Sequence, residues 1–182
     1  MKGAESIVRV SKFLGKKIVI KERIPKKYRS LELDTALRKT RTRIEARLLH
    51  KAKKAGVSCP LVWWVGDYTL YLSFIKGKQP HMDEKNAHDA GLILAKLHTA
   101  DIIHGDYTQA NLILDTELTV IDFGLGFFSN DVEDKAIDVI TMRNTIQKEE
   151  SKKAFLEGYK NYANASAVFK RLKLVESRVR YF

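Results

Sequence analysis

The stretch from His104 to Gly124 constrains the fold and chemistry of this 182-residue chain more than any other part of the sequence. It reads HGDYTQANLILDTELTVIDFG and carries Asp106, Asn111 and Asp122 at fixed offsets. Two short apolar runs separated by a polar Asp-Thr-Glu turn lie between the last two, which predicts a β-hairpin. Such a hairpin brings its two ends beside the loop of Asp106. We therefore expect Asp106 to act on an attacking hydroxyl, while Asn111 and Asp122 hold Mg²⁺ against phosphate oxygens.

The order of these residues matches the protein-kinase signature H-R-D-L-x-x-x-N followed by D-F-G. Here the first element is His104-Gly105-Asp106 with Asn111, and the second is Asp122-Phe123-Gly124. A hairpin with unrelated surface acids is the alternative, but chance rarely supplies the whole order and spacing. We expect His104 to pack as a brace for the loop. Gly105 replaces the arginine with which many kinases sense a phosphorylated activation loop, so we expect activity without such phosphorylation.

The first 30 residues predict two strands joined by a turn at Gly15. The second apolar run, residues 18–20, ends at Lys21. In a nucleotide-binding lobe, a strand lysine in this place points at the α- and β-phosphates of ATP. An ordinary strand-end lysine is the alternative, and Arg23 and the two lysines of the turn are weaker candidates for the same role.

Residues 31–55 predict one long helix, because apolar side chains recur at helical spacing before a glycine. From Arg38 to Lys54 this segment carries eight Lys or Arg residues and a single acid, Glu45. A lone acid at the edge of the apolar stripe suits an ion pair with Lys21, which would hold the lysine on the phosphates. A surface pair with Arg41 is the alternative. The basic outer face is either solvated or meets an acidic partner.

Two further segments predict nucleotide contacts. A second hairpin, residues 61–65 and 69–75, leads into the crossing between two lobes, where the backbone of Ser73 and Ile75 would hydrogen-bond the adenine edge. The glycine-rich loop of protein kinases is missing. Only Gly3-Ala4-Glu5 precedes the first strand, and its backbone N–H groups are the candidates for covering the phosphates of ATP.

The net charge of +11 favours an anionic partner such as nucleic acid or an acidic protein surface, with a merely soluble basic protein as the alternative. The sequence has no apolar run of the roughly 18 residues that a membrane span needs. It also shows no signal peptide, and its one cysteine, Cys59, suits a reducing compartment. We therefore expect a cytoplasmic protein that makes no membrane contact. His98 and His104 lack a third ligand, so we do not expect them to bind a metal.

The segment after Gly124 carries fewer signals. Asp138, in a predicted helix over residues 131–143, either braces the catalytic loop or lies on the surface. Residues 150–179 predict a final helical region. The end of the chain, Arg178–Phe182, combines arginine with aromatic residues and is either a nucleic-acid-contacting tail or a frayed terminus.

Taken together, these residues resemble the small atypical kinase subunit of the KEOPS complex, the Bud-thirty-two family, over nearly the whole chain. The residues that carry the resemblance are Gly3-Ala4-Glu5, Lys21 within IKERIPKKYR, Glu45 within RIEARLL, His104-Gly105-Asp106 with Asn111, and Asp122-Phe123-Gly124.

The resemblance implies a Mg²⁺-dependent kinase that hydrolyses ATP and phosphorylates itself or other proteins on serine. It also implies work beside the threonylcarbamoyltransferase subunit and the other KEOPS subunits that modify position thirty-seven of certain tRNAs, with tRNA contacted through basic surfaces. Some members are fused to the transferase, and the sequence leaves open whether this chain is a free subunit or part of a fusion.

We therefore expect an α+β, compact bilobal protein-kinase-like fold. Residues 1–75 would form a small β-sheet lobe with one long helix, and residues 76–182 a reduced helical catalytic lobe. A Rio-like or small-molecule kinase is one alternative, because H-G-D also occurs in antibiotic and choline kinases. Those enzymes use a large helical C-terminal region for the acceptor, and the segment after Asp122 is short. A non-catalytic nucleotide-binding scaffold is the other alternative.

Overall fold

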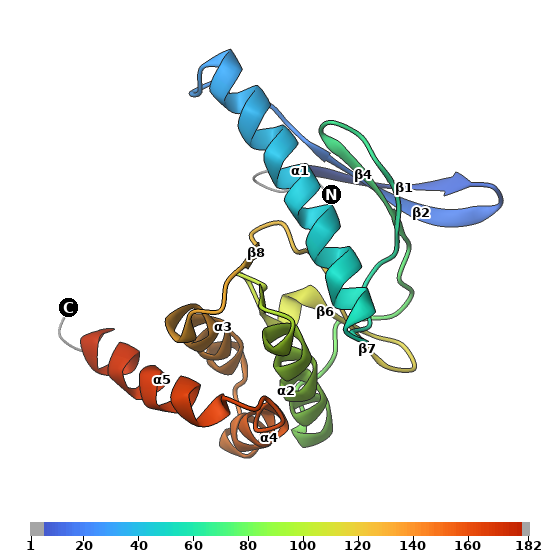
Figure 1. Ribbon diagram of the computed structural model, residues 1–182. Coiled ribbons are helices and arrows are strands. Elements are labelled where there is room, and N and C mark those ends of the chain that lie inside the picture. The colour runs from blue at the N-terminus through green and yellow to red at the C-terminus, as the bar shows by residue number, and fades with distance from the viewer. Residues whose placement is uncertain (1–5, 180–182) are drawn as a thin grey trace.

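The computed structural model describes residues 6–179, with side chains through residue 175. A sheet and a long helix form the upper part of the molecule, and a group of helices forms the lower part (Figure 1). This two-part α+β architecture confirms the expected fold class. The boundary between residues 75 and 76 as the division into two lobes stays a prediction.

Within the described residues, the upper sheet has four antiparallel strands in the order β1-β2-β4-β3. Their bounds are β1 Ser6–Phe13, β2 Lys16–Arg23, β3 Val62–Val65 and β4 Thr69–Ser73. Strand β2 runs two residues past Lys21, the predicted end, because β1 continues to pair with it as far as Arg23. Lys21 therefore lies inside a strand with a neighbour on each side, paired with Val8 of β1 and Leu70 of β4.

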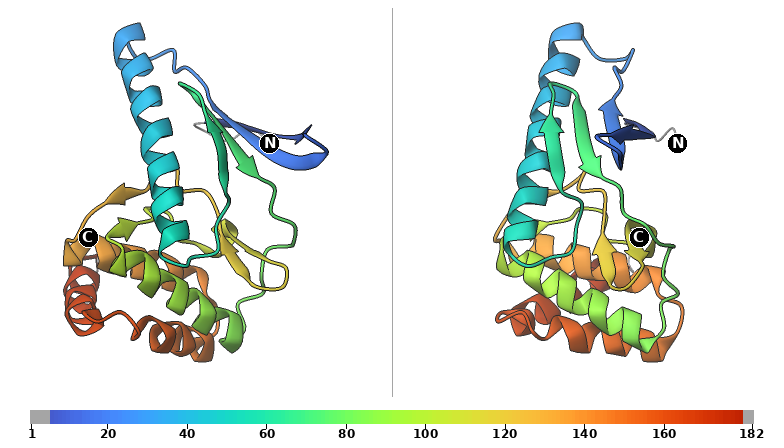
Figure 2. Two further views of the ribbon diagram at one scale, coloured as in Figure 1. Left: turned by 45° about the vertical axis from the view of Figure 1, so that its right-hand side comes forward. Right: turned by 90° about the vertical axis from the view of Figure 1, so that its right-hand side faces the viewer.

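The long helix α1, Leu31–Lys54, packs beside this sheet (Figures 1 and 2). Ser30 caps its first turn, with its hydroxyl accepting a hydrogen bond from the Leu33 N–H. The helix ends as predicted, and Gly56 follows in a left-handed conformation with φ 72°. Leu48, Leu49 and Ala52 are buried together with Glu45, so the acid lies on the inward face of the helix.

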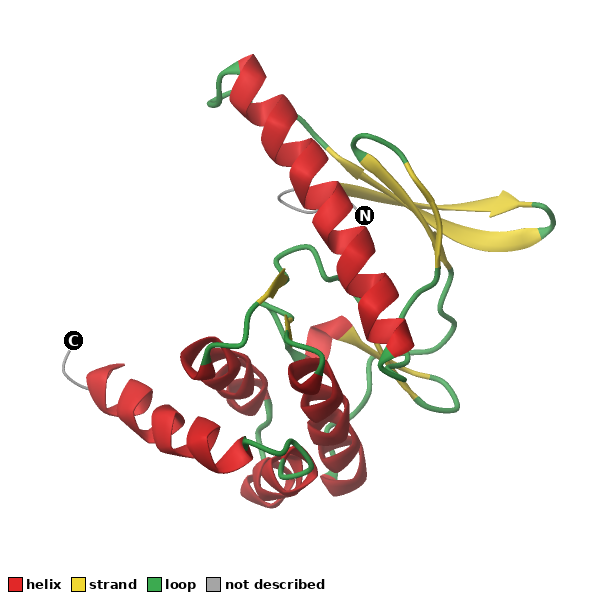
Figure 3. Cartoon of the chain, viewed as in Figure 1, coloured by secondary structure: helices red, strands yellow, loops and turns green. Residues whose placement is uncertain are grey.

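Four α-helices build most of the lower part between residues 76 and 179, and Figure 3 draws the helices as red ribbons. They are α2 Glu84–Thr99, α3 Val132–Thr145, α4 Glu149–Tyr159 and α5 Ala165–Val179. The predicted final helical region, residues 150–179, is confirmed, and a turn divides it into α4 and α5. In that turn the Asn161 side chain donates to the Gly158 carbonyl, and the Tyr162 hydroxyl accepts from Lys135 of α3. The backbone continues through this turn with shorter-range bonds, from the Asn161 N–H to the Gly158 carbonyl and from the Tyr162 N–H to the Tyr159 carbonyl.

Helices α2 and α4 approach closely through two glycines. A Cβ atom on Gly91 of α2 would overlap the Phe155 carbonyl, and one on Gly158 of α4 would overlap the His88 carbonyl. The backbones therefore meet with no side chain between them. Next to this contact, the hydroxyl of Tyr107 in the catalytic loop donates to the Ala90 carbonyl of α2.

Short strands position that loop between the two parts. The pairs are β5 Ile102–Ile103 with β8 Phe127–Phe128, and β6 Leu112–Leu114 with β7 Leu118–Val120. The second pair is the hairpin predicted from the two apolar runs. The 3₁₀ turn η1, Gln109–Asn111, leads directly into it.

Candidate active site

Asp106 and Asn111 face each other across the catalytic loop. The Asn111 amide nitrogen donates to the Asp106 carboxylate at 2.9 Å and to its backbone carbonyl at 2.8 Å. Because the amide nitrogen makes both bonds, the amide oxygen is left for another partner. The exposed Asp106 carboxylate is thus held in one orientation while it remains accessible to a substrate.

His104 connects this loop to the segment before Asp122. Its Nε2 bonds the Ile121 carbonyl at 3.1 Å, and its Nδ1 accepts from the Asp106 N–H at 3.3 Å. A carbonyl can only accept, so the ring is the neutral tautomer with the proton on Nε2. Burial lowers the pKa of His104, and this outweighs the nearby carboxylates, which act in the opposite direction. The expected bracing role of His104 is confirmed.

Asp138 of α3 holds the same loop from below. Its buried carboxylate accepts from the His104 N–H at 2.6 Å and from the Gly105 N–H at 2.9 Å. The His98 ring lies 3.4 Å away and bonds the Tyr159 hydroxyl through its other nitrogen at 2.7 Å. Of the two alternatives for Asp138, bracing is confirmed and a surface position is wrong. The ring nitrogens of His98 and His104 are all engaged in these bonds rather than shared at a metal.

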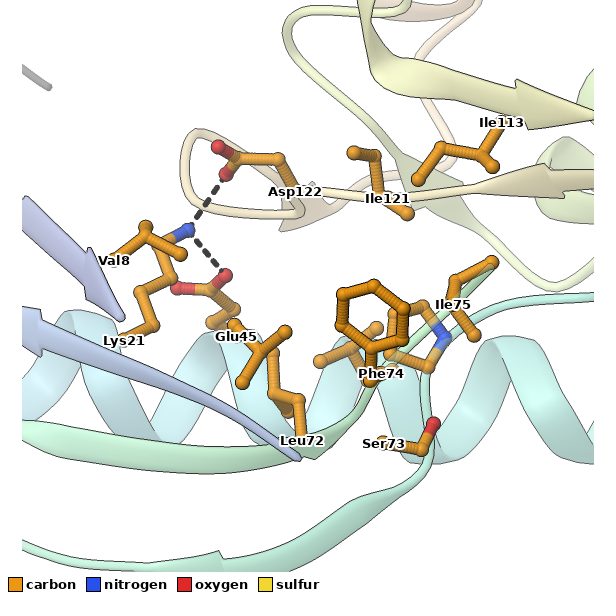
Figure 4. A pocket seen from close by; sticks show the side chains of 13 residues that line it. Val8, Lys21, Glu45, Leu72, Ser73, Phe74, Ile75, Ile113, Ile121 and Asp122 are labelled. Carbon is orange, nitrogen blue, oxygen red and sulfur yellow. Dashed lines mark hydrogen bonds and ion pairs between the residues drawn. The ribbon is translucent and has the colours of Figure 1, made fainter. Parts of the chain in front are cut away.

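Lys21 lies between two carboxylates at the mouth of a cleft (Figure 4). Its ammonium is 2.6 Å from Glu45 and 2.6 Å from Asp122. Burial disfavours the ammonium, but the two carboxylates outweigh this and raise the pKa of Lys21. Burial likewise disfavours the Asp122 carboxylate, but Lys21 and the Gly124 N–H outweigh this and lower the pKa of Asp122. The predicted pair of Lys21 with Glu45 is present, and Glu45 is buried rather than a surface partner of Arg41.

Arg23 is a member of this cluster that sequence reasoning missed. It was considered only as a weaker alternative to Lys21, yet its guanidinium lies 2.6 Å from the second oxygen of Glu45. The same nitrogen is 3.3 Å from the Gly124 carbonyl. Side chains two apart on a strand point to the same face, so the spacing of Lys21 and Arg23 was a signal for this contact.

The cleft itself has a volume of about 200 Å³ and mainly apolar walls. Val8 and Leu72 line it from the sheet, and Ile113 and Ile121 line it from the β6–β7 hairpin (Figure 4). Such a slot fits a flat aromatic ring with a charged group at one end.

Ser73 and Ile75 line the same cleft at the connection between the two parts. The Ser73 N–H and hydroxyl are engaged with the backbone of Leu61, so a nucleotide contact there would use the Ser73 carbonyl. The predicted adenine contacts of both residues stay predictions. Gly3, Ala4 and Glu5, which are predicted to cover the phosphates, lie outside the described residues. The same is true of residues 180–182 and of the side chains of Arg178 and Val179.

Gly105 has a structural requirement that the comparison with the kinase signature did not reveal. Its backbone adopts φ 77°, and a Cβ atom there would lie 2.5 Å from the Leu125 carbonyl. Glycine at this position therefore does not only stand in place of the arginine of the kinase signature. It permits the loop to pass close to the segment that follows Asp122.

Asn111 and Asp122 fit a Mg²⁺ ion in chemical type. An amide oxygen and a carboxylate are hard oxygen donors, and Mg²⁺ in phosphate-transferring proteins keeps water and phosphate oxygens as its remaining ligands. Within residues 6–179, no group of three or more His, Cys, Asp or Glu side chains could hold a metal ion. The role of Asn111 and Asp122 as metal ligands stays a prediction.

Two further expectations concern the chain as a whole. Cys59 is buried, and burial raises the pKa of its thiol to about 11, in keeping with a small packing residue. None of the described helices is both long and apolar enough to pass through a bilayer.

The fold and the site define a protein-kinase-like protein. A crystal structure of the Rio2 kinase–ADP/Mg²⁺–phosphoaspartate complex from Chaetomium thermophilum matches with a TM-score of 0.68 at 15% identity, covering 100% of this chain and 70% of that one. The macrolide 2′-phosphotransferase MphH from Brachybacterium faecium matches with a TM-score of 0.66 at 12% identity, covering 97% and 80%. At these identities the likeness establishes the fold alone.

Sequence relatives identify the family. A probable serine/threonine-protein kinase BUD32 homolog from Archaeoglobus fulgidus is 40% identical over 90% of this chain and 88% of its own length. The chain belongs to the family of BUD32 homologs, as the resemblance in its motifs predicted. A probable bifunctional tRNA threonylcarbamoyladenosine biosynthesis protein from Methanobrevibacter smithii is also 40% identical, and a similar one from Methanosarcina acetivorans is 36% identical. The chain spans about a third of these two proteins, 36% and 35% of their lengths. No protein-family model matches the chain.

Proposed function

We propose that this chain is a Mg²⁺- and ATP-dependent phosphotransferase that acts on serine or threonine hydroxyls and also hydrolyses ATP. The observation that carries the proposal is the continuous connection from Asp106 through His104 to the segment of Asp122, with Lys21 paired to Asp122 at 2.6 Å. This arrangement supports Asp106 as the base, Lys21 as the phosphate-binding cation, and Asn111 and Asp122 as metal ligands. The name of the Archaeoglobus relative agrees with it.

Each residue would contribute a separate part of the reaction. Bound magnesium would neutralise charge on the phosphate oxygens. Asp106 would accept the hydrogen bond of the attacking hydroxyl or water and orient it, and Asn111 keeps that carboxylate in place. Lys21 would bind phosphate oxygens while Glu45 positions it. The apolar cleft would hold the adenine ring.

The first prediction tests this assignment with purified protein, ATP and Mg²⁺. We expect slow phosphate release, lowered about 100-fold or more by Asp106→Ala or Asp122→Ala, because each removes a group acting on the reacting phosphate. Asp115→Ala is the matched control, since Asp115 is an exposed acid in the hairpin turn. Turnover in this control should stay within about twofold of the parent. Nucleotide binding without turnover in the parent would favour the scaffold alternative instead.

We further propose that the chain works in tRNA threonylcarbamoyladenosine synthesis, as a regulatory KEOPS subunit beside a threonylcarbamoyltransferase. The support is the naming of the bifunctional relatives, in which a chain of this kind is about a third of a longer protein. Co-purification from source cells, with mass spectrometry of bound proteins and sequencing of bound RNA, tests it. Recovery of the chain without a transferase or tRNA would contradict it. The cytoplasmic location stays a prediction.

Helix α1 offers the basic surface that best suits tRNA. Lys39, Arg43, Arg47 and Lys51 recur every four residues and form one ridge, which we call the α1 basic ridge. Arg47 and Lys51 also lie over the partly exposed ring of Phe128, at 5.7 and 5.0 Å from its centroid. Cations beside an exposed aromatic ring suit a phosphate backbone with unstacked bases. The role of the tail Arg178–Phe182 in tRNA binding stays a separate prediction.

A further inference from the structure

Arg23 is a buried cation without a place in the proposed reaction. Only 4% of the residue is exposed, and its backbone is fixed at both sides, with the N–H donating to the Tyr68 carbonyl and the carbonyl accepting from Arg38. Burying a guanidinium is costly unless it is fully paired. The groups that pair with Arg23 must therefore offset the cost of burying its charge, and they indicate what the residue does.

The first partner is Glu45, whose carboxylate has one cation for each oxygen. Lys21 contacts Oε1 and Arg23 contacts Oε2, both at 2.6 Å. Lys21 also pairs with Asp122 at the mouth of the cleft, so its ammonium is shared between two carboxylates, and a bound phosphate would become a further partner. The contact of Arg23 uses the other oxygen and does not depend on Lys21. Arg23 then still holds Glu45, and with it helix α1, against the sheet.

The second partner is the segment that follows Asp122. The guanidinium lies 3.3 Å from the Gly124 carbonyl, while the Gly124 N–H donates to Asp122 Oδ1 at 3.1 Å. Asp122 adopts φ 62°, a left-handed conformation that costs a non-glycine residue about 1 kcal/mol. Contacts around Gly124 are what can maintain that conformation, and Arg23 supplies one of them from β2.

We propose that Arg23 is a positioning residue that fixes β2, helix α1 and the Asp122 segment together, so that the site is assembled without a phosphorylated activation loop. The proposal rests on the proposed function, because it explains how the assigned residues keep their places. It also gives a physical reason for activity with Gly105 in place of the signal-sensing arginine. In kinases that carry this arginine, an added phosphate pairs with it and orders the loop, whereas here the Arg23 guanidinium contacts the Asp122 segment directly.

The test compares Arg23→Met with Arg9→Met. Methionine keeps most of the side-chain length but removes the charge and the donors. Arg9 lies on the neighbouring strand in an exposed pair with Glu22, so it controls for the loss of an arginine from the sheet. We expect kcat for ATP turnover to fall at least tenfold in Arg23→Met, with KM for ATP within threefold. The Mg²⁺ concentration for half-maximal activity should rise, because Asp122 is less well positioned. Arg9→Met should change each value less than twofold.

Hydrogen exchange gives a readout that needs no activity. Amides in the segment 41–52 of α1 should exchange at least fivefold faster in Arg23→Met than in Arg9→Met, while amides of α4 exchange alike in both. Equal rates in α1 with unchanged kcat would overturn the proposal, and so would equal acceleration in α1 and α4, which would indicate general destabilisation. If the parent lacks ATP turnover, the proposed function fails, but the exchange data still decide whether Arg23 fixes α1.

A second variant covers the case in which Arg23→Met does not fold. The double variant Arg23→Met/Glu45→Gln removes both members of the buried pair, which leaves no unpaired charge between them. Because Arg23 also contacts the Gly124 carbonyl, the double variant should still lose at least threefold in kcat relative to Glu45→Gln alone. Equal kcat in these two variants would show that Arg23 does not act on the Asp122 segment and would overturn the proposal.

Discussion

At Gly105 two separate constraints act on one backbone position. The residue adopts φ 77° and also passes close to the Leu125 carbonyl. Gly15, in the β1–β2 turn, has nearly the same φ of 75°, but a Cβ atom there would meet no atom of the described residues within 4 Å. A comparison of substitutions at the two glycines therefore separates the cost of a left-handed conformation from the cost of a steric overlap.

The second prediction uses this contrast. Gly15→Ala should lower the free energy of unfolding by about 1 kcal/mol, the cost of a left-handed conformation alone. Gly105→Ala should cost about 2–4 kcal/mol, because the overlap with Leu125 is added. It should also reduce ATP turnover, since Asp106 is the next residue. Chemical denaturation and phosphate-release assays measure both effects. Equal costs for the two variants would mean that the loop moves away freely.

At the scale of single elements, α1 serves two surfaces at once. Its inward face carries Glu45 to the active site, and its outward face carries the α1 basic ridge. Between Thr35 and Lys54 its one acid is Glu45, which is buried, so the repulsion along the ridge is offset mainly at Lys39, which pairs with Asp67 at 2.9 Å. A polyanion bound along the ridge would relieve that repulsion.

The third prediction concerns this ridge. Replacing Arg43, Arg47 and Lys51 by Gln should weaken tRNA binding at least tenfold and flatten its salt dependence, because fewer counterions are released. The matched control replaces Lys152, Lys153 and Lys160 of the α4 region by Gln, which removes the same charge. Fluorescence anisotropy at several salt concentrations measures both. An equal weakening by the control would assign the effect to net charge rather than to the ridge.

At the scale of the whole molecule, a chain of buried polar groups links the lower helices to the catalytic loop. His98 of α2 contacts Tyr159 of α4 and Asp138 of α3, and Asp138 holds the loop backbone. Burial lowers the pKa of His98 and Lys135 adds to this, while Asp138 opposes it. The folded state therefore favours the neutral ring.

The fourth prediction follows from the sign of that shift. An unfolded histidine has its pKa near 6.5, so the stabilising effect of the neutral ring is fully present above this pH. As the pH falls below 6.5 towards the lower folded pKa, the unfolded chain takes up a proton first, and stability falls. Each such histidine contributes a slope of up to about 1.4 kcal/mol per pH unit in that window.

Denaturation at pH 7, 6 and 5 measures this slope. It should be shallower in His98→Gln than in the parent, while His50→Gln, at an exposed position on α1, should leave it unchanged. His104 should maintain part of the slope in every variant, because its pKa is lowered in the same direction. A parent stability that is constant from pH 7 to 5 would contradict the prediction.

The sequence was sufficient for residues whose role is defined by spacing. The two apolar runs between Asn111 and Asp122 predicted the β6–β7 hairpin, and the isolation of Glu45 on a basic helix predicted its ion pair with Lys21; the structure contains both. The sequence was insufficient where tertiary contacts determine the end of a helix or the partners of a side chain. At the break between α4 and α5, Asn161 bonds the Gly158 carbonyl and Tyr162 bonds Lys135 of α3. No local sequence pattern predicts the bond between Tyr162 and α3. Arg23 was missed although its spacing from Lys21 places it on the same face of β2; its other partner, the Gly124 carbonyl, is brought close only by folding.

The crossing of α2 and α4 at Gly91 and Gly158 has a consequence for how this protein can change over time. A clash between side chains can be relieved by a smaller neighbour, but glycine has no smaller substitute. A substitution at either position therefore cannot be rescued by its opposite. Genetic suppressors of such a change should appear at positions that let a whole helix shift, and lineages that keep this crossing should retain both residues together.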